Sequence, residues 1–85
     1  MWYVYLLQCN DNSYYTGITT DVDRRISEHN NSLRGAKYTR SRRPVELVYS
    51  ILVGNRSQAM REEHRIKKLT RKQKLDLIKN VEDLF

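Results

Sequence analysis

"WYVYLLQCNDNSYYTGITT", residues 2–20, is the stretch that decides the fold. Residues 2–9 are rich in aromatic and β-branched side chains on both alternating faces, which predicts a central strand covered on both sides. The polar segment NDNS at 10–13 predicts a turn. A second strand at 14–19 then pairs most simply with the first, so we expect an antiparallel hairpin at the heart of the molecule.

An amphipathic helix is expected directly after this hairpin. The side-chain oxygens of TTD at 19–21 suit a helix N-cap. Val22, Ile26, His29 and Leu33 then recur at helical spacing and define one face. The helix is expected to end near Asn30 and Asn31 or at Gly35.

The rest of the chain alternates a strand with helices. We expect a basic loop at 32–44, a third strand at 45–53, and a helix capped by Ser57 that runs to about residue 69. A last helix begins at Thr70, with Leu75, Ile78 and Val81 facing inward. The predicted fold is α+β, a small three-stranded antiparallel sheet flanked by helices in the order β-β-α-β-α-α, in a single domain spanning residues 1–85.

Composition limits the classes of function. A chain of 85 residues buries too little surface for a deep cofactor cavity, so we expect a shallow site and no small-molecule cofactor. No apolar run approaches the length of a membrane span, so no membrane partner is expected. Sixteen Lys and Arg against ten acidic residues give a net charge of +6, which favours a polyanionic partner such as nucleic acid. The single cysteine, Cys9, excludes an internal disulfide and indicates a reduced, cytoplasmic setting.

The first helix carries two candidate functional residues. Arg25 and His29 lie one turn apart beside the apolar stripe, whereas Arg24 points to nearly the opposite side. Helical spacing alone favours the plainer interpretation, a packed histidine and an arginine that reaches to water.

Tyrosines gather near the start of that helix. Tyr3 and Tyr5 share a face of the first strand, and Tyr15 lies on its partner strand two residues before Gly17. For any one tyrosine the plainer role is to fill space and hydrogen-bond the backbone. A glycine at position 17 permits either a tight bend or the close approach of a ligand backbone.

The loop SLRGAKYTRSRRP contains cations and one aromatic residue without any acid. This composition favours phosphate contacts combined with stacking on a base or sugar. The candidate nucleic-acid-binding residues are Lys37, Tyr38, Arg40, Arg42 and Arg43, with Arg34 as a further cation. A second basic tract at 65–74 is expected on a helix, where a solvated face would explain it.

Two adjacent glutamates stand near the edge of an apolar helix face. Periodicity does not choose between Glu62 and Glu63, and most helical glutamates are surface residues paired with nearby cations.

In this order and at these spacings, the motifs resemble the GIY-YIG nuclease superfamily, in particular its small single-domain, UPF0213-like members. YVY at 3–5 stands at the family's G-I-Y and YTG at 15–17 at its Y-I-G. Arg25 and His29 match the family's arginine and histidine. The pattern A-x-x-x-E-x-x-I-K-K-L from Ala59 selects Glu63 as the family's metal-binding glutamate. Tyr3 stands in place of the first motif glycine and Thr16 in place of an aliphatic residue, but both motif tyrosines remain.

The resemblance implies metal-dependent hydrolysis of a phosphodiester bond. Glu63 would hold Mg²⁺ or Mn²⁺ together with water and substrate oxygens. Arg25 would place a positive charge at the scissile phosphate. Tyr5 or Tyr15 would accept the proton of the attacking water, with His29 as a hydrogen-bond partner of a tyrosine or the phosphate. The expected catalytic residues are Tyr5, Tyr15, Arg25, His29 and Glu63.

The leading hypothesis is a divalent-metal-dependent endonuclease that acts as a monomer on DNA, with structured or damaged DNA, as in DNA repair, as the candidate substrate. One alternative is a non-catalytic nucleic-acid-binding module of the same fold. A further alternative is an interaction domain whose basic face docks an acidic protein.

Overall fold

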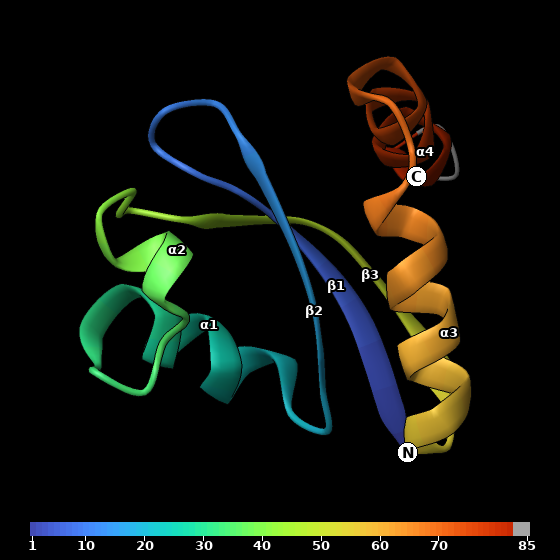
Figure 1. Ribbon diagram of the computed structural model, residues 1–85, viewed down its shortest axis with the longest axis horizontal. Coiled ribbons are helices and arrows are strands. Elements are labelled where there is room, and N and C mark those ends of the chain that lie inside the picture. Colours follow the sequence, from blue (N-terminus) through green and yellow to red (C-terminus); the bar gives the residue numbers. More distant parts are fainter. Residues whose placement is uncertain (83–85) are drawn as a thin grey trace.

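A computed structural model describes residues 1–82 of the chain, with side chains through residue 80. Three strands and four helices follow one another along it (Figure 1). They are β1 (Trp2–Gln8), β2 (Tyr14–Thr19), α1 (Val22–Asn31), α2 (Lys37–Arg40), β3 (Glu46–Gly54), α3 (Arg56–Lys67) and α4 (Arg71–Glu82). The α+β fold with a three-stranded antiparallel sheet is confirmed. The order is β-β-α-α-β-α-α, because the segment that was predicted as a basic loop contains one helical turn, α2.

The sheet has the order β2-β1-β3, and β1 pairs antiparallel with both neighbours. The prediction of a central first strand is therefore confirmed. The register places Gly17 of β2 and Ser50 of β3 on either side of Tyr5. Tyr5 thus stands in the middle of the sheet, and its neighbour across the hairpin is a residue without a side chain.

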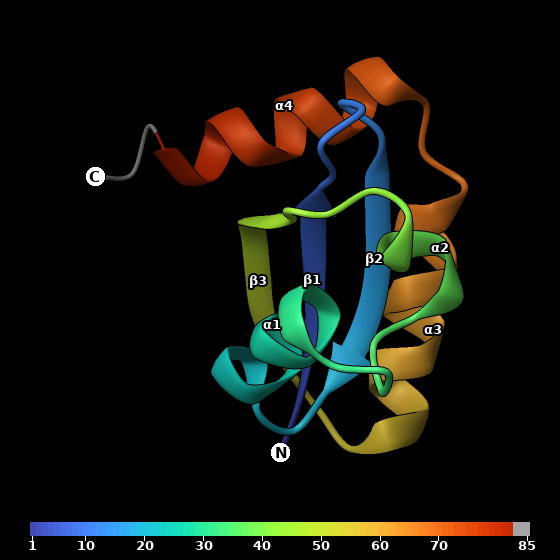
Figure 2. The same cartoon turned by 90° about the vertical axis from the view of Figure 1, so that its left-hand side faces the viewer.

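Helices cover both faces of the sheet. Figure 1 shows α1 and α2 on one side and α3 and α4 on the other, and Figure 2 shows α1 and α2 in front of the strands. Because successive residues of β1 point to opposite faces, the strand contributes to two separate clusters of buried side chains. The α3-face cluster contains Val4, Leu6, Tyr49, Ala59, Ile66 and Ile78. The α1-face cluster contains Tyr5, Leu7, Cys9 and Val45.

Side-chain caps mark where three helices begin. The Asp21 carboxylate accepts a hydrogen bond from the Arg24 amide at 3.1 Å, as TTD predicted. The prediction of Ser57 as the cap of α3 was wrong. Asn55 takes that role in a reciprocal capping box with Gln58, because the chain enters the helix directly after Gly54 ends the strand.

Arg43 closes the other end of α1. Its guanidinium donates to the carbonyl oxygens of His29 at 2.5 Å and of Glu28 at 3.4 Å, and to that of Ser32. These bonds satisfy carbonyls that the end of a helix leaves without partners. Leu33 therefore lies beyond the helix and is 82% exposed, so its predicted place on the buried face was wrong.

In α4 the prediction is borne out in part. Thr70 and Gln73 form the expected cap through their side chains and amides. Ile78 is buried, but Leu75 is 38% exposed because only one side of α4 packs on the sheet. The predicted position of the Val81 side chain lies outside the described residues. Within residues 1–82 no helix has both the length and the apolar character needed to cross a bilayer.

Candidate active site

The centre of the site is a buried hydrogen bond between a strand and a helix. The Tyr5 hydroxyl lies 2.8 Å from Nε2 of His29, and both side chains are almost completely buried. Burial, with a smaller contribution from the charges of Tyr15 and Glu63, raises the pKa of Tyr5 to about 12, although Arg25 opposes this rise. Burial and the positive charge of Arg25 lower the pKa of His29 to about 4. Both groups are therefore neutral at neutral pH in the free protein.

The second ring nitrogen of His29 faces the start of α2. Its Nδ1 lies 2.9 Å from the Thr39 hydroxyl and 3.4 Å from the Ala36 amide nitrogen. Thr39 is fully buried. The imidazole is thus held from both sides, and a histidine that helical spacing alone assigned to packing forms a bridge between β1 and α2.

Gly17 makes room for the Tyr5 hydroxyl. A Cβ at position 17 would lie 2.4 Å from that oxygen and 2.5 Å from the ring carbon that carries it. No heavier residue fits there without moving the tyrosine. The sequence predicted a tight bend or the approach of a ligand backbone at this glycine. The structure instead shows the close approach of a side chain of the protein itself, that of Tyr5.

Aromatic rings surround the Tyr5–His29 pair. The Tyr15 ring lies 5.2 Å from the His29 ring, in an edge-on arrangement, and 6.4 Å from that of Tyr5. The Tyr38 ring stacks on Tyr15 at 6.1 Å, and the guanidinium of Arg42 covers Tyr38 at 3.8 Å. Strands β1 and β2 and helices α1 and α2 therefore all contribute to one cluster.

The two adjacent arginines of α1 differ as expected. Arg24 is exposed, whereas Arg25 is half-buried and donates to Glu28 at 3.0 Å and to the Arg34 carbonyl at 2.8 Å. Burial alone would lower the pKa of Arg25, but contact with Tyr5 and Glu28 raises it. Arg25 is a held positive charge beside the Tyr5 hydroxyl.

The two adjacent glutamates of α3 also differ. Glu62 pairs with Arg65 and contributes to the raised pKa of Tyr49 on the α3 face. Glu63 pairs loosely with Lys67 at 3.5 Å, and its charge acts on Tyr5. Helical periodicity did not choose between the two glutamates. In the folded protein they differ, because the charge of Glu63 makes a small contribution to the raised pKa of Tyr5 on the α1 face.

A metal at this place would have only Glu63 as a protein ligand. The described residues contain no group of three or more His, Cys, Asp or Glu that could enclose an ion. An oxygen donor with room for water suits Mg²⁺ or Mn²⁺, which retain waters and accept substrate phosphate oxygens. The donor set therefore fits a hard divalent ion whose coordination shell is completed by water and substrate.

The predicted nucleic-acid-binding residues separate into two groups. Lys37 and Arg40 on α2 are exposed and free to meet phosphate. Arg42 is bound to Asp11 and the Tyr38 carbonyl, and Arg43 holds the end of α1. Because the Arg42 guanidinium lies over the Tyr38 ring, a base could stack on that face only after Arg42 moved.

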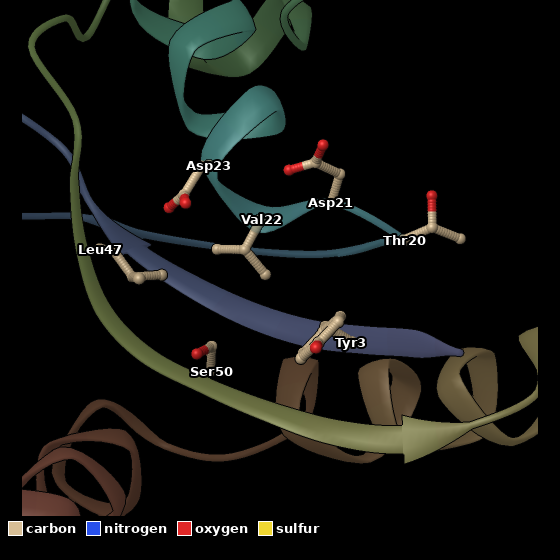
Figure 3. A pocket seen from close by; sticks show the side chains of 7 residues that line it. All are labelled: Tyr3, Thr20, Asp21, Val22, Asp23, Leu47 and Ser50. Carbon is tan, nitrogen blue, oxygen red and sulfur yellow. The ribbon is translucent and has the colours of Figure 1, made fainter.

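A pocket on the same face of the sheet lies beside the cluster. It is lined by Tyr3, Thr20, Asp21, Val22, Asp23, Leu47 and Ser50 (Figure 3). None of the five expected catalytic residues lines it. Its charged side chains are the carboxylates of Asp21 and Asp23 at the start of α1, which would repel a polyanion.

Thr39 and Ala36 are the members of the site that sequence reasoning missed. Both belong to the segment AKYTR, whose cations dominated its interpretation. No local pattern marks a threonine that meets a histidine ten residues away. The burial of Thr39 among basic neighbours becomes visible only once α2 folds back onto α1.

Known proteins share much of the sequence and the fold of this chain. The family described as the GIY-YIG catalytic domain matches residues 1–76. A UPF0213 protein of Desulfotalea psychrophila is 52% identical over 84 residues, which cover 99% of this chain and 76% of that protein. A UPF0213 protein of Staphylococcus haemolyticus is 54% identical over 76 residues, which cover 89% of this chain and 92% of that protein.

Two solution NMR structures have the same fold. A UPF0213 protein from Bacillus halodurans, 50% identical, superimposes with a TM-score of 0.58 over 93% of this chain and 84% of its own. A protein from E. faecalis, 48% identical, gives a TM-score of 0.62 over 94% of this chain and 84% of its own. On sequence and structure alike, this chain belongs to the GIY-YIG family and, within it, to the small UPF0213 proteins.

Proposed function

We propose that the chain is a divalent-metal-dependent endonuclease that hydrolyses phosphodiester bonds in DNA, acting as a single-domain monomer. Structured or damaged DNA is the candidate substrate. The observation that carries the proposal is the buried Tyr5–His29 pair with Arg25 at its edge and the charge of Glu63 acting on it. Catalysis needs such a set, namely a proton acceptor, a fixed positive charge and a carboxylate for a metal.

We assign to Tyr5 the role of accepting the proton of the attacking water, because the contact with Arg25 favours its phenolate. A protonated phenol is a poor base, and burial makes the Tyr5 phenolate harder to form. Arg25 favours the phenolate, whereas the negative charge of Glu63 disfavours it. Tyr15, which is partly exposed beside the pair, is placed to orient the water or the phosphate.

Glu63 would hold the divalent ion. When bound there, Mg²⁺ or Mn²⁺ would neutralise the carboxylate that disfavours the Tyr5 phenolate and stabilise negative charge on the leaving oxygen. Arg25, held by Glu28 and the Arg34 carbonyl, would meet the scissile phosphate with a charge already in place. Lys37 and Arg40 would bind flanking phosphates, and each such contact makes binding more sensitive to salt.

The adjacent glutamates supply a matched test. Duplex, flap, branched and single-stranded DNA would be incubated with the parent protein, Glu63→Ala and Glu62→Ala, each with and without Mg²⁺. We expect Mg²⁺-dependent cleavage by the parent, a loss of about 10²-fold or more in Glu63→Ala, and little change in Glu62→Ala. The control removes the same charge one residue away.

Two results would contradict the proposal. If Glu63→Ala and the parent cleaved DNA equally at matched metal concentration, the assignment of Glu63 as the metal ligand would be wrong. Salt-sensitive DNA binding without any cleavage would instead favour a non-catalytic nucleic-acid-binding module of this fold.

A further inference from the structure

We infer that Thr39 is a positioning residue that holds His29 in the tautomer with its proton on Nε2, so that His29 donates to the hydroxyl oxygen of Tyr5. The meaning of this for catalysis rests on the nuclease function proposed above. The tautomer itself follows from the donors and acceptors around the ring and is measurable without DNA.

The environment of Nδ1 decides where the proton lies. The Ala36 amide can only donate, and it is directed at Nδ1 from 3.4 Å. A proton on Nδ1 would face this N–H group, and two donors would then oppose each other in a largely buried place. Nδ1 therefore carries a lone pair, and it accepts from the Ala36 amide and from Thr39.

Thr39 has its hydroxyl proton available for this bond. Its oxygen lies 2.9 Å from both Nδ1 and the Ala36 carbonyl oxygen, but it has one proton to give. That carbonyl already accepts the amides of Thr39 at 3.1 Å and Arg40 at 3.2 Å. The carbonyl stays satisfied without the hydroxyl, whereas Nδ1 has no other partner at so short a distance.

Water does not replace Thr39 in this role. Thr39 and His29 are both 0% exposed, so removal of the hydroxyl leaves the ring nitrogen without its shortest partner. Burial keeps the ring neutral, and the neighbouring charges act in the same direction, since Arg25 and Arg43 outweigh Glu28 in their effect on the pKa of His29. A neutral ring with a lone pair on Nδ1 has its one proton on Nε2, 2.8 Å from Tyr5.

The direction of that bond defines what His29 does. In this tautomer Tyr5 accepts from His29, so the imidazole does not accept the hydroxyl proton of Tyr5. In the phenolate form of Tyr5, the Nε2–H group already aims at the oxygen, and a hydrogen bond to the charged form stabilises it. His29 acts as a donor that supports the phenolate and does not take the Tyr5 proton.

Long-range ¹H–¹⁵N NMR correlations of the imidazole test this directly at neutral pH, without metal or DNA. The parent protein, Thr39→Ser and Thr39→Val would be compared, with the exposed His64 as an internal reference. We expect the parent and Thr39→Ser to show a protonated Nε2 and an unprotonated Nδ1 for His29. In Thr39→Val we expect a changed Nδ1 shift with both tautomers populated, and cleavage lowered roughly tenfold and restored by serine.

A proton on Nδ1 in the parent protein would overturn the assignment. So would His29 nitrogen shifts in Thr39→Val that match those of the parent. If Thr39→Val does not fold, the spectra of the parent and of Thr39→Ser still decide the tautomer. If the parent cuts no DNA, the proposed nuclease function fails, and the nitrogen shifts still decide the role of Thr39.

Discussion

The two faces of the sheet are built from different kinds of contact. On the α3 face, β1 meets apolar side chains, and Ala59 and Ile66 are fully buried there. On the α1 face, the same strand buries a hydroxyl, an imidazole and a second hydroxyl in one hydrogen-bonded series, Tyr5, His29 and Thr39. The apolar face supplies stability through area removed from water, and the other face holds polar groups in defined orientations.

The largest expected effect comes from the apolar face. Ile66→Ala removes a fully buried side chain and should lower the free energy of unfolding by about 2–5 kcal/mol, measured by urea denaturation. Cleavage per folded molecule should stay near the parent value at low temperature, because the buried cluster that contains Ile66 includes none of the catalytic candidates. Ile66→Val is the control and should cost about 0.5–1.5 kcal/mol. If Ile66→Ala kept full stability but lost cleavage, the proposed division of roles between the two faces would be wrong.

A smaller effect is expected from Arg25, and it should fall on activity. Arg25→Ala removes the held charge beside Tyr5 and should lower the cleavage rate by about 10²–10³-fold, equivalent to roughly 3–4 kcal/mol. Arg24→Ala, which removes the exposed neighbour, is the matched control. Rates would be measured on one oligonucleotide with Mg²⁺, after circular dichroism has shown that both variants are folded. Equal losses of cleavage rate in the two variants would mean that Arg25 contributes only to the overall positive charge of the protein and has no specific role at the phosphate.

The dependence of stability on pH should come from the α1 face. The pKa of His29 is about 4 in the folded protein and 6.5 in the unfolded chain, so between these values the unfolded chain binds the extra proton. The free energy of unfolding should therefore fall as pH drops from about 6.5 towards 4, by at most about 3 kcal/mol. Denaturation at several pH values checks this. His29→Gln should lose this part of the slope, and His64→Gln should keep it. A parent slope that His29→Gln leaves unchanged would contradict the burial of a neutral imidazole.

Sequence patterns predicted what is local or periodic. Aromatic and β-branched residues predicted the central strand, the polar segment after residue 9 predicted the hairpin turn, and helical spacing separated Arg25 from Arg24. What escaped prediction depends on contacts between distant segments. The single turn α2 is too short for periodicity to detect. The sequence predicted Arg43 as a cation available to phosphate, whereas in the folded chain its guanidinium binds the end of α1.

The candidate site shows the same limit. Helical spacing placed His29 beside Arg25 but could not tell a packed histidine from one bonded to Tyr5 and Thr39. The glutamate pair was equally ambiguous, because both side chains lie at the edge of α3. The family pattern selects Glu63, and the structure adds a difference in the surrounding charges, since Arg65 engages Glu62 while Glu63 acts on Tyr5.

The contact between Gly17 and Tyr5 also bears on how accurately the hairpin folds. A slip of β2 by two residues keeps every side chain on its proper face, so alternating hydrophobicity alone does not penalise it. Such a slip would place Tyr15 or Thr19 opposite Tyr5, where even a Cβ lies too close to the hydroxyl. The residue that makes room for the Tyr5 hydroxyl thus selects a single strand alignment, and a misaligned hairpin could not assemble the candidate site.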